Sequence, residues 1–144
     1  MEVKQIEAKD TYKIRNDILR PGQSIKDCVF KGDDDEMSFH LGAFIDNELT
    51  SVASFFMQKS KHFDDEYQYR LRGMATMAQF QGRGLSKALL QTAFNLIKRN
   101  NVKLLWCNAR KSAEGFYLTA GFEKVGEYFE IEGIGSHIVM FKKI

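Results

Sequence analysis

The sequence predicts an α+β fold with the element order β-α-β-β-β-α-β-α-β-β, and three observations carry this prediction. Strand-like runs at residues 38–45, 49–57 and 67–77 follow one another with short connections, which favours an antiparallel meander. The apolar period then becomes helical over residues 85–97 before another apolar strand, which is typical of a β-α-β crossover. A length of 144 residues allows one core and leaves little room for a second domain.

The N-terminal region contributes one strand and one helix. Residues 2–7 alternate and predict a short strand. Asp10 is expected to cap a helix from about Thr11 to Arg20, which Pro21-Gly22 ends. The next loop is irregular, and its run from Asp33 to Glu36 is interpreted as a solvated turn, because these acids lack the glycine of a calcium loop.

The remaining elements follow from periodicity and from turn residues. Asp46-Asn47-Glu48 predicts a hairpin turn between the first two strands of the meander. The central helix ends at Asn100-Asn101, and its buried stripe is predicted as Leu85, Ala88, Leu89, Thr92, Ala93, Leu96 and Ile97. We further expect a strand over 102–107, a helix over 113–120 closed by Gly121, and strands over 122–131 and 136–142.

The composition excludes several classes of protein. The 21 basic and 19 acidic residues give a net charge of +2 without a basic stripe, so we expect no nucleic-acid partner. No apolar run approaches the roughly 20 residues that span a bilayer, and the N-terminus has no signal core, so a cytoplasmic location without membrane contact is expected. Cys28 and Cys107 form no disulfide framework and no zinc spacing with the histidines, so no metal is expected.

The stretch from Met74 to Ser86 indicates a phosphate-binding site. A predicted strand passes through a loop that contains Gly82 and Gly84 and enters the central helix directly. Glycines let the backbone approach an anion, and a helix N-terminus offers unpaired N–H groups at the positive end of its dipole. Arg83 and Lys87 add positive charge nearby.

Common nucleotide-binding patterns do not explain this loop. The Walker pattern is absent, which disfavours a nucleotide hydrolase. The dinucleotide pattern G-x-G-x-x-G also fails, because Lys87 occupies its last position. A lone G-x-G before a helix is equally compatible with a tight turn and close helix packing, so the assignment depends on a second motif.

That second motif reads Ala113-x-x-Phe116-Tyr117-x-x-x-Gly121-Phe122. Together with Gln81-x-x-Gly84-x-Ser86, it resembles the two signatures of the GNAT superfamily of acyl-CoA-dependent N-acetyltransferases. The phrase Arg20-Pro-Gly-Gln and the run Gly135-Ser-His137 resemble those of its small uncharacterised bacterial members. The resemblance covers nearly the whole chain. It implies a single domain over residues 1–144, built on a mixed, mostly antiparallel seven-stranded sheet with helices on both faces.

The first signature has two registers in this chain. The slipped register Gln79-x-x-Gly82-x-Gly84 matches its letters fully, whereas the register above ends on Ser86 in place of glycine or alanine. We favour the latter because Leu85 begins the helical stripe, and because Met74 and Thr76 then occupy the family's usual strand positions.

The resemblance implies a role for each part of the loop and strand. Backbone N–H groups of about Gln81 to Ser86 hold the CoA pyrophosphate, and the backbone of Met74 and Thr76 pairs with the pantetheine arm. A bulge near Gly73 opens the slot, an N–H near Met74 or Ala75 polarises the thioester carbonyl, and Asn108 bonds the pantetheine amides. The predicted cofactor-binding residues are Met74, Ala75, Thr76, Gln81, Gly82, Arg83, Gly84, Leu85, Ser86, Asn108 and Phe116.

Tyr117 is the predicted catalytic residue. A phenol with a pKa near 10 is able to supply a proton or a strong hydrogen bond to the leaving CoA thiolate. Periodicity alone places Tyr117 on the apolar stripe of its helix, as a core residue beside Phe116, and only the motif favours the catalytic role.

The general base and the acceptor site have several candidates. His137 and His40 titrate in the useful range, and Arg70 and Arg72 share one predicted strand face with Met74 and Thr76. The acceptor pocket is expected from residues 11–37 and the hairpin near residues 133–137, with Arg72 and His137 as acceptor-side candidates. Distal bases without positional support are Glu66, Glu127 and Glu130.

These residues lead to one function and one alternative. The chain is predicted to transfer an acetyl group from acetyl-CoA, as co-substrate, to a primary amine of a small molecule or peptide, by direct attack in a ternary complex. The alternative is a catalytically weak CoA-binding or sensing module of the same fold. Dimerisation is common in the superfamily, so a homodimer is a candidate assembly, although no apolar stripe marks an interface.

Overall fold

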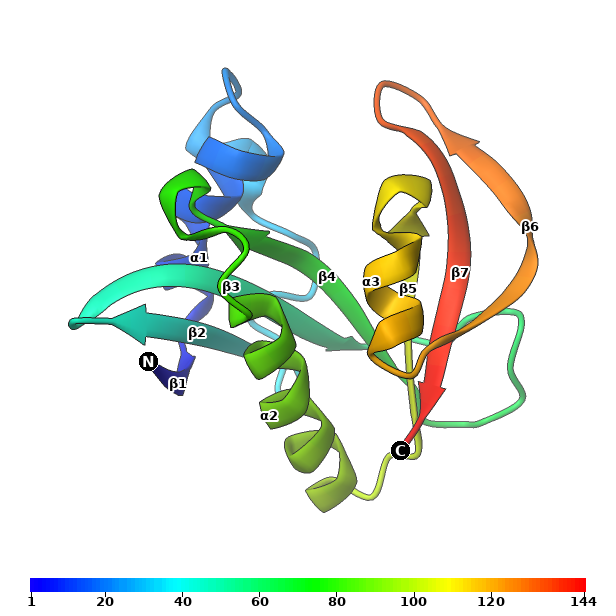
Figure 1. Ribbon diagram of the computed structural model, residues 1–144. Coiled ribbons are helices and arrows are strands. Elements are labelled where there is room, and N and C mark those ends of the chain that lie inside the picture. The colour runs from blue at the N-terminus through cyan, green and yellow to red at the C-terminus, as the bar shows by residue number, and fades with distance from the viewer. The chain divides into compact units, whose positions relative to one another are not determined.

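The computed structural model describes residues 1–144, and the chain divides into two compact units. Met1–Phe56 and Leu71–Leu96 form the first unit, whereas Met57–Arg70 and Ile97–Ile144 form the second. Figure 1 labels the helices and strands of both units.

The first unit is built on strands β1 (Glu2–Ile6), β2 (Phe39–Ile45), β3 (Glu48–Met57) and β4 (Tyr69–Thr76). Strand β2 pairs antiparallel with β1 and with β3. Asp46 and Asn47 form the β2–β3 turn with φ angles of 49° and 66°, as a two-residue hairpin turn that follows the strand twist requires. The predicted hairpin is confirmed.

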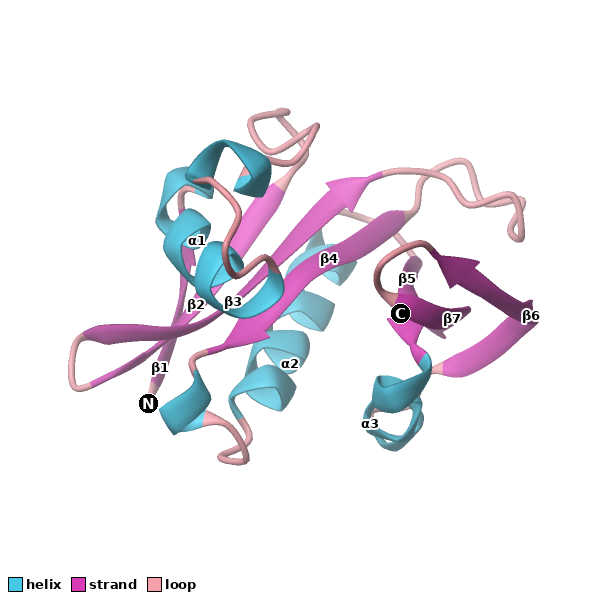
Figure 2. Ribbon diagram, turned by 90° about the horizontal axis from the view of Figure 1, so that it is seen from above, coloured by secondary structure: helices cyan, strands magenta, loops and turns pink.

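Two helices cover opposite faces of this sheet (Figure 2). Helix α1 (Ala8–Ile14) continues into a π-helical turn (Arg15–Leu19), and α2 (Leu85–Arg99) packs on the other face. On the α1 face, Ile14 packs with Val52 and Ala75. The buried side of α2 confirms the predicted stripe in part: Leu85, Leu89, Ala93 and Ile97 are buried, and Ala88, Thr92 and Leu96 are half-buried. Leu90, which lies outside the predicted stripe, is also buried.

The start of the first helix differs from the prediction. Helix α1 begins at Ala8 rather than at Thr11, with Glu7 in the N-cap position. Asp10 lies in the first turn, and its carboxylate accepts a hydrogen bond of 3.0 Å from the backbone N–H of Glu7. Asp10 therefore caps the helix by reaching back three residues, as the acidic partner of a capping box does, and not from in front of the helix.

The second unit contains β5 (Leu104–Arg110), α3 (Glu114–Thr119), β6 (Glu123–Ile131) and β7 (Gly135–Lys143). Strand β7 pairs antiparallel with both β5 and β6. The first residues of β4 also belong to this unit: Tyr69 and Arg70 pair in parallel with Leu105 and Trp106. Strand β5 ends at Arg110, beyond the predicted boundary, because its pairing with β7 continues to His137.

Hydrogen-bonded pairing links the strands in the order β1-β2-β3-β4-β5-β7-β6. Strands β4 and β5 are parallel, and α2 connects them as the predicted crossover. The predicted α+β fold with a mixed, mostly antiparallel seven-stranded sheet is therefore confirmed. None of the helices combines the length and the apolar character that a membrane span needs.

Candidate functional site

The loop between β4 and α2 has the backbone of an anion-binding site. A 3₁₀ turn (Ala78–Phe80) leads into the exposed residues 81–84, and Gly82 and Gly84 have φ angles of 77° and 79°. Open space surrounds both glycines, so glycine is required here by the left-handed backbone and not by a close neighbour. The first N–H groups of α2 have no intrahelical acceptor, which leaves them available to an anion.

Side chains hold this loop to the end of β4. The amide of Gln81 donates to the carbonyl of Thr76 over 3.1 Å. The hydroxyl of Thr76 lies 2.7 Å from that of Ser51 and 3.4 Å from that of Ser86. Ser86, the position that departs from the signature, therefore connects the start of α2 to β4 through Thr76.

Strand β4 is irregular at Gly73. Its φ of 65° lies in the left-handed region, and a Cβ there would stand 2.8 Å from Cε2 of Phe30 and 3.3 Å from Nε of Arg15. Arg72 contacts the rings of Phe30 and Phe56, whereas Ala75 packs on Ile14 of the same sheet face. Two residues three apart share a face only where an extra residue interrupts the alternation, as in the β-bulge expected near Gly73.

This irregularity corrects one prediction about Arg72. Arg72 does not share a strand face with Thr76: it lies on the α1 face, whereas Thr76 bonds Ser51, which alternates with the α1-facing Val52. The left-handed Gly73 inverts the alternation between them.

Tyr117 of α3 is buried against Cys107 of β5 in the second unit. Tyr117 is 8% exposed, and its hydroxyl forms a hydrogen bond with the Cys107 thiol. Burial, and then the neighbouring thiol, raise the pKa of Tyr117 well above 10. Burial also raises the pKa of Cys107 to about 12, against the opposing effects of Tyr117 and Arg70. Both groups are therefore protonated at neutral pH, so the Tyr117 hydroxyl is a hydrogen-bond donor and not a base.

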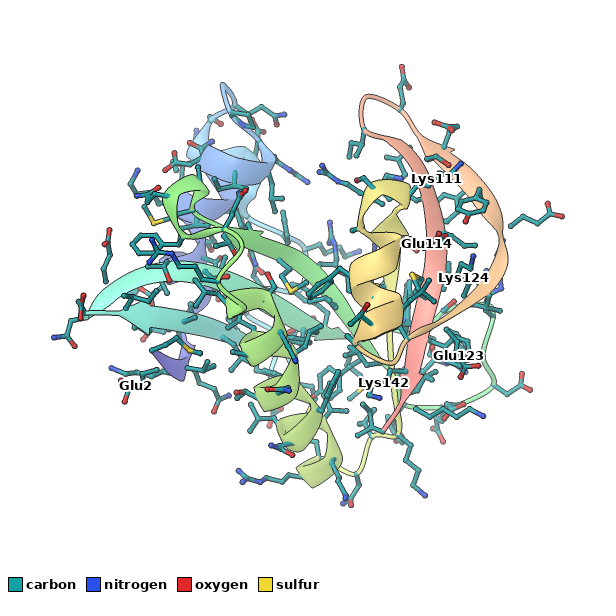
Figure 3. The ribbon with its side chains drawn as sticks, viewed as in Figure 1. Glu2, Lys111, Glu114, Glu123, Lys124 and Lys142 are labelled. Carbon is teal, nitrogen blue, oxygen red and sulfur yellow. The ribbon has the colours of Figure 1, made fainter.

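The second unit also contains an exposed tyrosine. Tyr128 is 44% exposed and donates a hydrogen bond to the carboxylate of Glu114, which also pairs with Lys124 at 3.5 Å. Glu114 begins α3 and Lys124 lies on β6, and both are labelled in Figure 3. The ion pair thus connects β6 to the helix that carries Tyr117.

Asn108 lies on the other face of β5 from Tyr117. Cys107 points toward Tyr117, so its neighbours Trp106 and Asn108 point away, and both line a cavity of about 810 Å³. The Arg70 guanidinium lies 5.0 Å from the Trp106 ring centroid in this cavity wall. The structure thus does not bring Asn108 and Tyr117 together. Asn108, which follows the predicted strand over 102–107, lies within β5.

The two candidate histidines differ in availability. The Nε2 of His40 donates to the carbonyl of Asp33 over 2.8 Å, and its Nδ1 lies 2.7 Å from the hydroxyl of Ser54, so both nitrogens are engaged. In His137, Nδ1 donates to the carbonyl of Gly135 over 2.8 Å, which leaves Nε2 as the unprotonated nitrogen of the neutral ring. Of the two, only His137 retains a nitrogen without a hydrogen bond.

A buried ion pair beside β4 was missed by the sequence analysis. Arg15 is 0% exposed and donates to both carboxylate oxygens of Asp33, over 2.8 Å and 2.9 Å. It also donates to the carbonyl of Cys28 and the hydroxyl of Ser54. Burial raises the pKa of Asp33, but hydrogen bonds from Arg15 and from the Phe30 N–H outweigh burial and hold it below its usual value.

Asp33 also corrects the predicted solvated turn. Asp33 is only 5% exposed, whereas Asp34, Asp35 and Glu36 are exposed as expected. The only local sequence signal of the buried ion pair was Arg15, a charged residue next to the apolar Ile14 in the predicted helix. Its partner lies 18 residues away in an irregular loop, a separation at which no periodicity operates.

The predicted site residues are thus distributed over both units. The first unit contains the strand and loop residues, and within it the structure brings together Thr76, Gln81 and Ser86. The second unit contains Asn108, Phe116, Tyr117 and His137. Phe116 is 36% exposed and meets the Tyr117 ring edge to face at 5.2 Å between centroids.

Comparisons with known proteins agree with this architecture. The chain is 44% identical over 144 residues to the uncharacterized N-acetyltransferase YitI of Bacillus subtilis, covering 100% of this chain and 97% of that protein. The crystal structure of Escherichia coli ElaA matches the fold with a TM-score of 0.78 at 17% identity, over 98% of both chains. An aminoglycoside 6'-N-acetyltransferase complexed with coenzyme A matches with a TM-score of 0.75 at 12% identity, over 99% of this chain and 97% of that one.

A family model described as an acetyltransferase (GNAT) domain matches residues 21–144, which include the Gln81–Gly84 loop and Tyr117. This match, the identity with YitI and the shared fold support the same assignment as the two sequence signatures. The chain belongs to the GNAT acetyltransferase family.

Proposed function

We propose that residues 1–144 form one domain that transfers an acetyl group from acetyl-CoA to a primary amine of a small molecule or peptide. The amine attacks the thioester directly while both substrates are bound. The C–N bond forms as the C–S bond breaks, the amine loses a proton to solvent or to a base, and the CoA thiolate accepts one.

The observation that carries this proposal is the exposed loop at the start of α2. Gly82 and Gly84 adopt left-handed conformations in open space, and unpaired N–H groups of a 15-residue helix follow them. These residues fit a pyrophosphate, which is one of the anionic groups of CoA. The aminoglycoside 6'-N-acetyltransferase structure of similar fold is complexed with coenzyme A, which supports the same ligand here.

The strand before the loop is assigned to the acyl-bearing arm. The backbone of Met74 and Thr76 would pair with the pantetheine amides as an added strand does. The bulge at Gly73 turns the backbone out of regular alternation just before Met74, whose N–H we assign as the donor to the thioester carbonyl. A donor that is already positioned stabilises the charge that develops on this oxygen.

We assign the proton for the leaving sulfur to Tyr117. Its raised pKa keeps the phenol protonated at neutral pH, so its O–H is available to donate a hydrogen bond to the sulfur as negative charge develops there. When the Cys107 thiol donates to the phenol oxygen, the O–H of Tyr117 is free to donate elsewhere. His137, with a free Nε2, is the candidate on the acceptor side.

Release of free thiol tests the reaction. The protein is incubated with acetyl-CoA and a panel of primary amines, and free CoA is followed with a thiol reagent while mass spectrometry detects N-acetylated product. The two cysteines, Cys28 and Cys107, are 0% and 2% exposed, so the folded protein adds little background. Saturable CoA binding without product from any amine would overturn the proposal and favour a CoA-binding or sensing module.

A glycine pair tests the loop. We expect Gly84→Val to weaken CoA binding by about tenfold or more, because a β-branched residue resists the left-handed conformation of the loop. Gly133→Val is the matched control, since Gly133 has the same φ of 79°, also in open space, in the β6–β7 turn. Calorimetric titration with CoA measures both, and equal affinities in the two variants would contradict the assignment.

A further inference from the structure

Three arginines surround one phenylalanine ring in the first unit. The guanidinium carbons of Arg15, Arg72 and Arg20 lie 3.9 Å, 4.4 Å and 5.1 Å from the ring centroid of Phe30. Phe30 itself is 7% exposed. We call Arg15, Arg20, Arg72 and Phe30 the arginine cluster.

The charges of the arginine cluster are not balanced. Asp33 neutralises Arg15 with two hydrogen bonds. Arg20 donates to the backbone carbonyl of Asp27, which has no net charge. The Arg72 guanidinium has neither a hydrogen bond nor an ion pair, and its contacts are with the rings of Phe30 and Phe56. Two positive charges therefore remain without an acidic partner on a half-buried surface.

The lowered pKa of Arg72 is consistent with this unbalanced positive charge. Burial lowers the pKa of Arg72, and Arg20 and Arg15 lower it further, against the opposing effect of Asp33. The positive neighbours are thus not compensated by the one buried carboxylate. Arg72 is partly buried, so solvent screens its charge less than at an open surface.

The arginine cluster adjoins the irregular part of β4. Phe30 and Arg15 are the groups that a Cβ at residue 73 would meet, and Arg72 and Met74 flank that glycine in the chain. Arg15 also begins the π-helical turn, a distortion often found at functional sites. If the N–H of Met74 holds the thioester carbonyl, as the proposed function states, the cluster stands beside the bond that the acceptor amine attacks.

We propose that Arg72 and Arg20 bind a carboxylate or phosphate group of the acceptor, so that the substrate is a small amine that carries a negative charge. A guanidinium presents paired N–H donors that match both anions, and Arg72 has all of its donors free. Arg15, fixed by Asp33, positions the Phe30 ring on which the other two guanidinium groups lie. The statement that the anion belongs to an acceptor amine rests on the proposed function. The statement that Arg72 and Arg20 bind an anion does not.

A paired substrate panel tests the specificity. We compare kcat/KM for β-alanine with β-alaninamide and for O-phosphoethanolamine with ethanolamine, at one ionic strength. The wild type should prefer the acidic member of at least one pair by about tenfold or more, the effect of charge-assisted hydrogen bonds. The pair that shows the preference identifies the anion as carboxylate or phosphate.

Arg72→Gln should abolish this preference, chiefly through KM for the acidic amine. Dividing the preference of the wild type by the preference of the variant cancels differences in basicity between the paired amines. The matched control is Arg99→Gln, which removes an exposed charge at the end of α2 and should keep the preference. A fall in the Tm of ligand-free Arg72→Gln would indicate a structural role, whereas an anion site predicts an equal or higher Tm, because repulsion is relieved.

A binding measurement separates this inference from the proposed function. With CoA present in excess, so that the phosphate loop is filled, succinate or inorganic phosphate should raise the Tm of the wild type by about 3 °C at ten times the dissociation constant. Succinamide with matched sodium chloride is the blank, and Arg72→Gln should lose the shift while Arg99→Gln keeps it.

The outcomes are distinct. No product from any amine, with an Arg72-dependent shift in Tm, overturns the proposed function and supports the anion site. Product from neutral amines at equal or higher kcat/KM overturns the anion site and leaves the reaction in place. A substrate preference or a Tm shift that survives Arg72→Gln also overturns the anion site. The absence of both in the wild type overturns it as well.

Discussion

Two buried polar pairs, one in each unit, respond to burial in opposite ways. Arg15 and Asp33 in the first unit are both ionised, and the pKa of Asp33 is lowered. Cys107 and Tyr117 in the second unit are both neutral, and both of their pKa values are raised. Burial penalises charge in each case, but only the first pair contains an opposite charge that outweighs the penalty.

The difference teaches what each pair is suited to do. An ion pair that is 0% and 1% exposed at its side chains is a fixed scaffold, since neither partner is easily lost. A neutral phenol beside a neutral thiol keeps a transferable proton at neutral pH. The first pair therefore shapes the wall around Phe30 and Gly73, whereas the second contains the protonated phenol to which the proposed role in thiol departure is assigned.

Removal of Arg15 should have the largest effect. Arg15→Met leaves Asp33 buried without its counter-charge, and we expect the free energy of unfolding to fall by about 3–5 kcal/mol. Denaturant unfolding measures this. The control is Lys13→Met on the same helix, whose exposed ion pair with Asp17 should be worth about 0.5 kcal/mol or less. Similar losses in the two variants would remove the distinction between a scaffold pair and a surface pair.

Substitution of Gly73 should have the next largest effect. Gly73→Ala adds a Cβ that would stand 2.8 Å from Phe30 at a φ of 65°, so strain and overpacking should together cost about 2–3 kcal/mol. Gly82→Ala shares the left-handed φ but has open space, and should cost about 1 kcal/mol. The difference in Tm between the variants isolates the contact with the arginine cluster, and equal Tm values would argue against that contact.

Loss of the phenol tests the neutral pair. Tyr117→Phe should lower kcat by at least about tenfold at neutral pH, because the leaving thiolate loses its donor, while KM for acetyl-CoA changes little. Tyr128→Phe removes an exposed hydroxyl from the same unit and should leave kcat unchanged. Steady-state kinetics decide, and full activity of Tyr117→Phe would exclude the assigned role.

The smallest expected effect is on the pH dependence of stability, where the two pairs should lose their contributions at opposite ends of the pH range. Because the pKa of Asp33 is lower in the folded state, its contribution is present above about pH 4 and is lost as the pH falls through the folded pKa. Cys107 behaves oppositely: its contribution is present below about pH 8.5 and is lost as the pH rises toward its folded pKa of about 12.

Melting temperatures across pH measure both limits. The Tm gap between wild type and Asp33→Asn should narrow on acidification, and that between wild type and Cys107→Ala should narrow on alkalinisation. Gaps that stay constant with pH would show that neither side chain titrates differently in the folded and unfolded states.

Local sequence signals predicted much of the fold. The hairpin at Asp46-Asn47, the stripe of α2 and the β4-α2-β5 crossover depend on residues close together in the chain. The Gly82 and Gly84 loop was recognisable for the same reason, since a backbone conformation is encoded by the residue that adopts it. Asp10 was assigned to the correct helix end but to the wrong position, because a cap acts equally well from within the first turn.

Contacts between distant segments were not predictable in this way. Arg15 meets Asp33 across an irregular loop, and Tyr117 meets Cys107 only because α3 folds back onto β5. Alternation placed Arg72 on the wrong face because one left-handed glycine inverts it.

The sequence by itself therefore determined the order of the elements, the family signatures and the glycine loop at the start of α2, since each is written in neighbouring residues. Only the tertiary structure decided which charges are neutralised and which remain open. Burial and distance set the energy of a charge, and neither is a property of a short stretch of chain. For this reason the unpaired Arg72, and the acidic acceptor that it suggests, emerged from the packed structure.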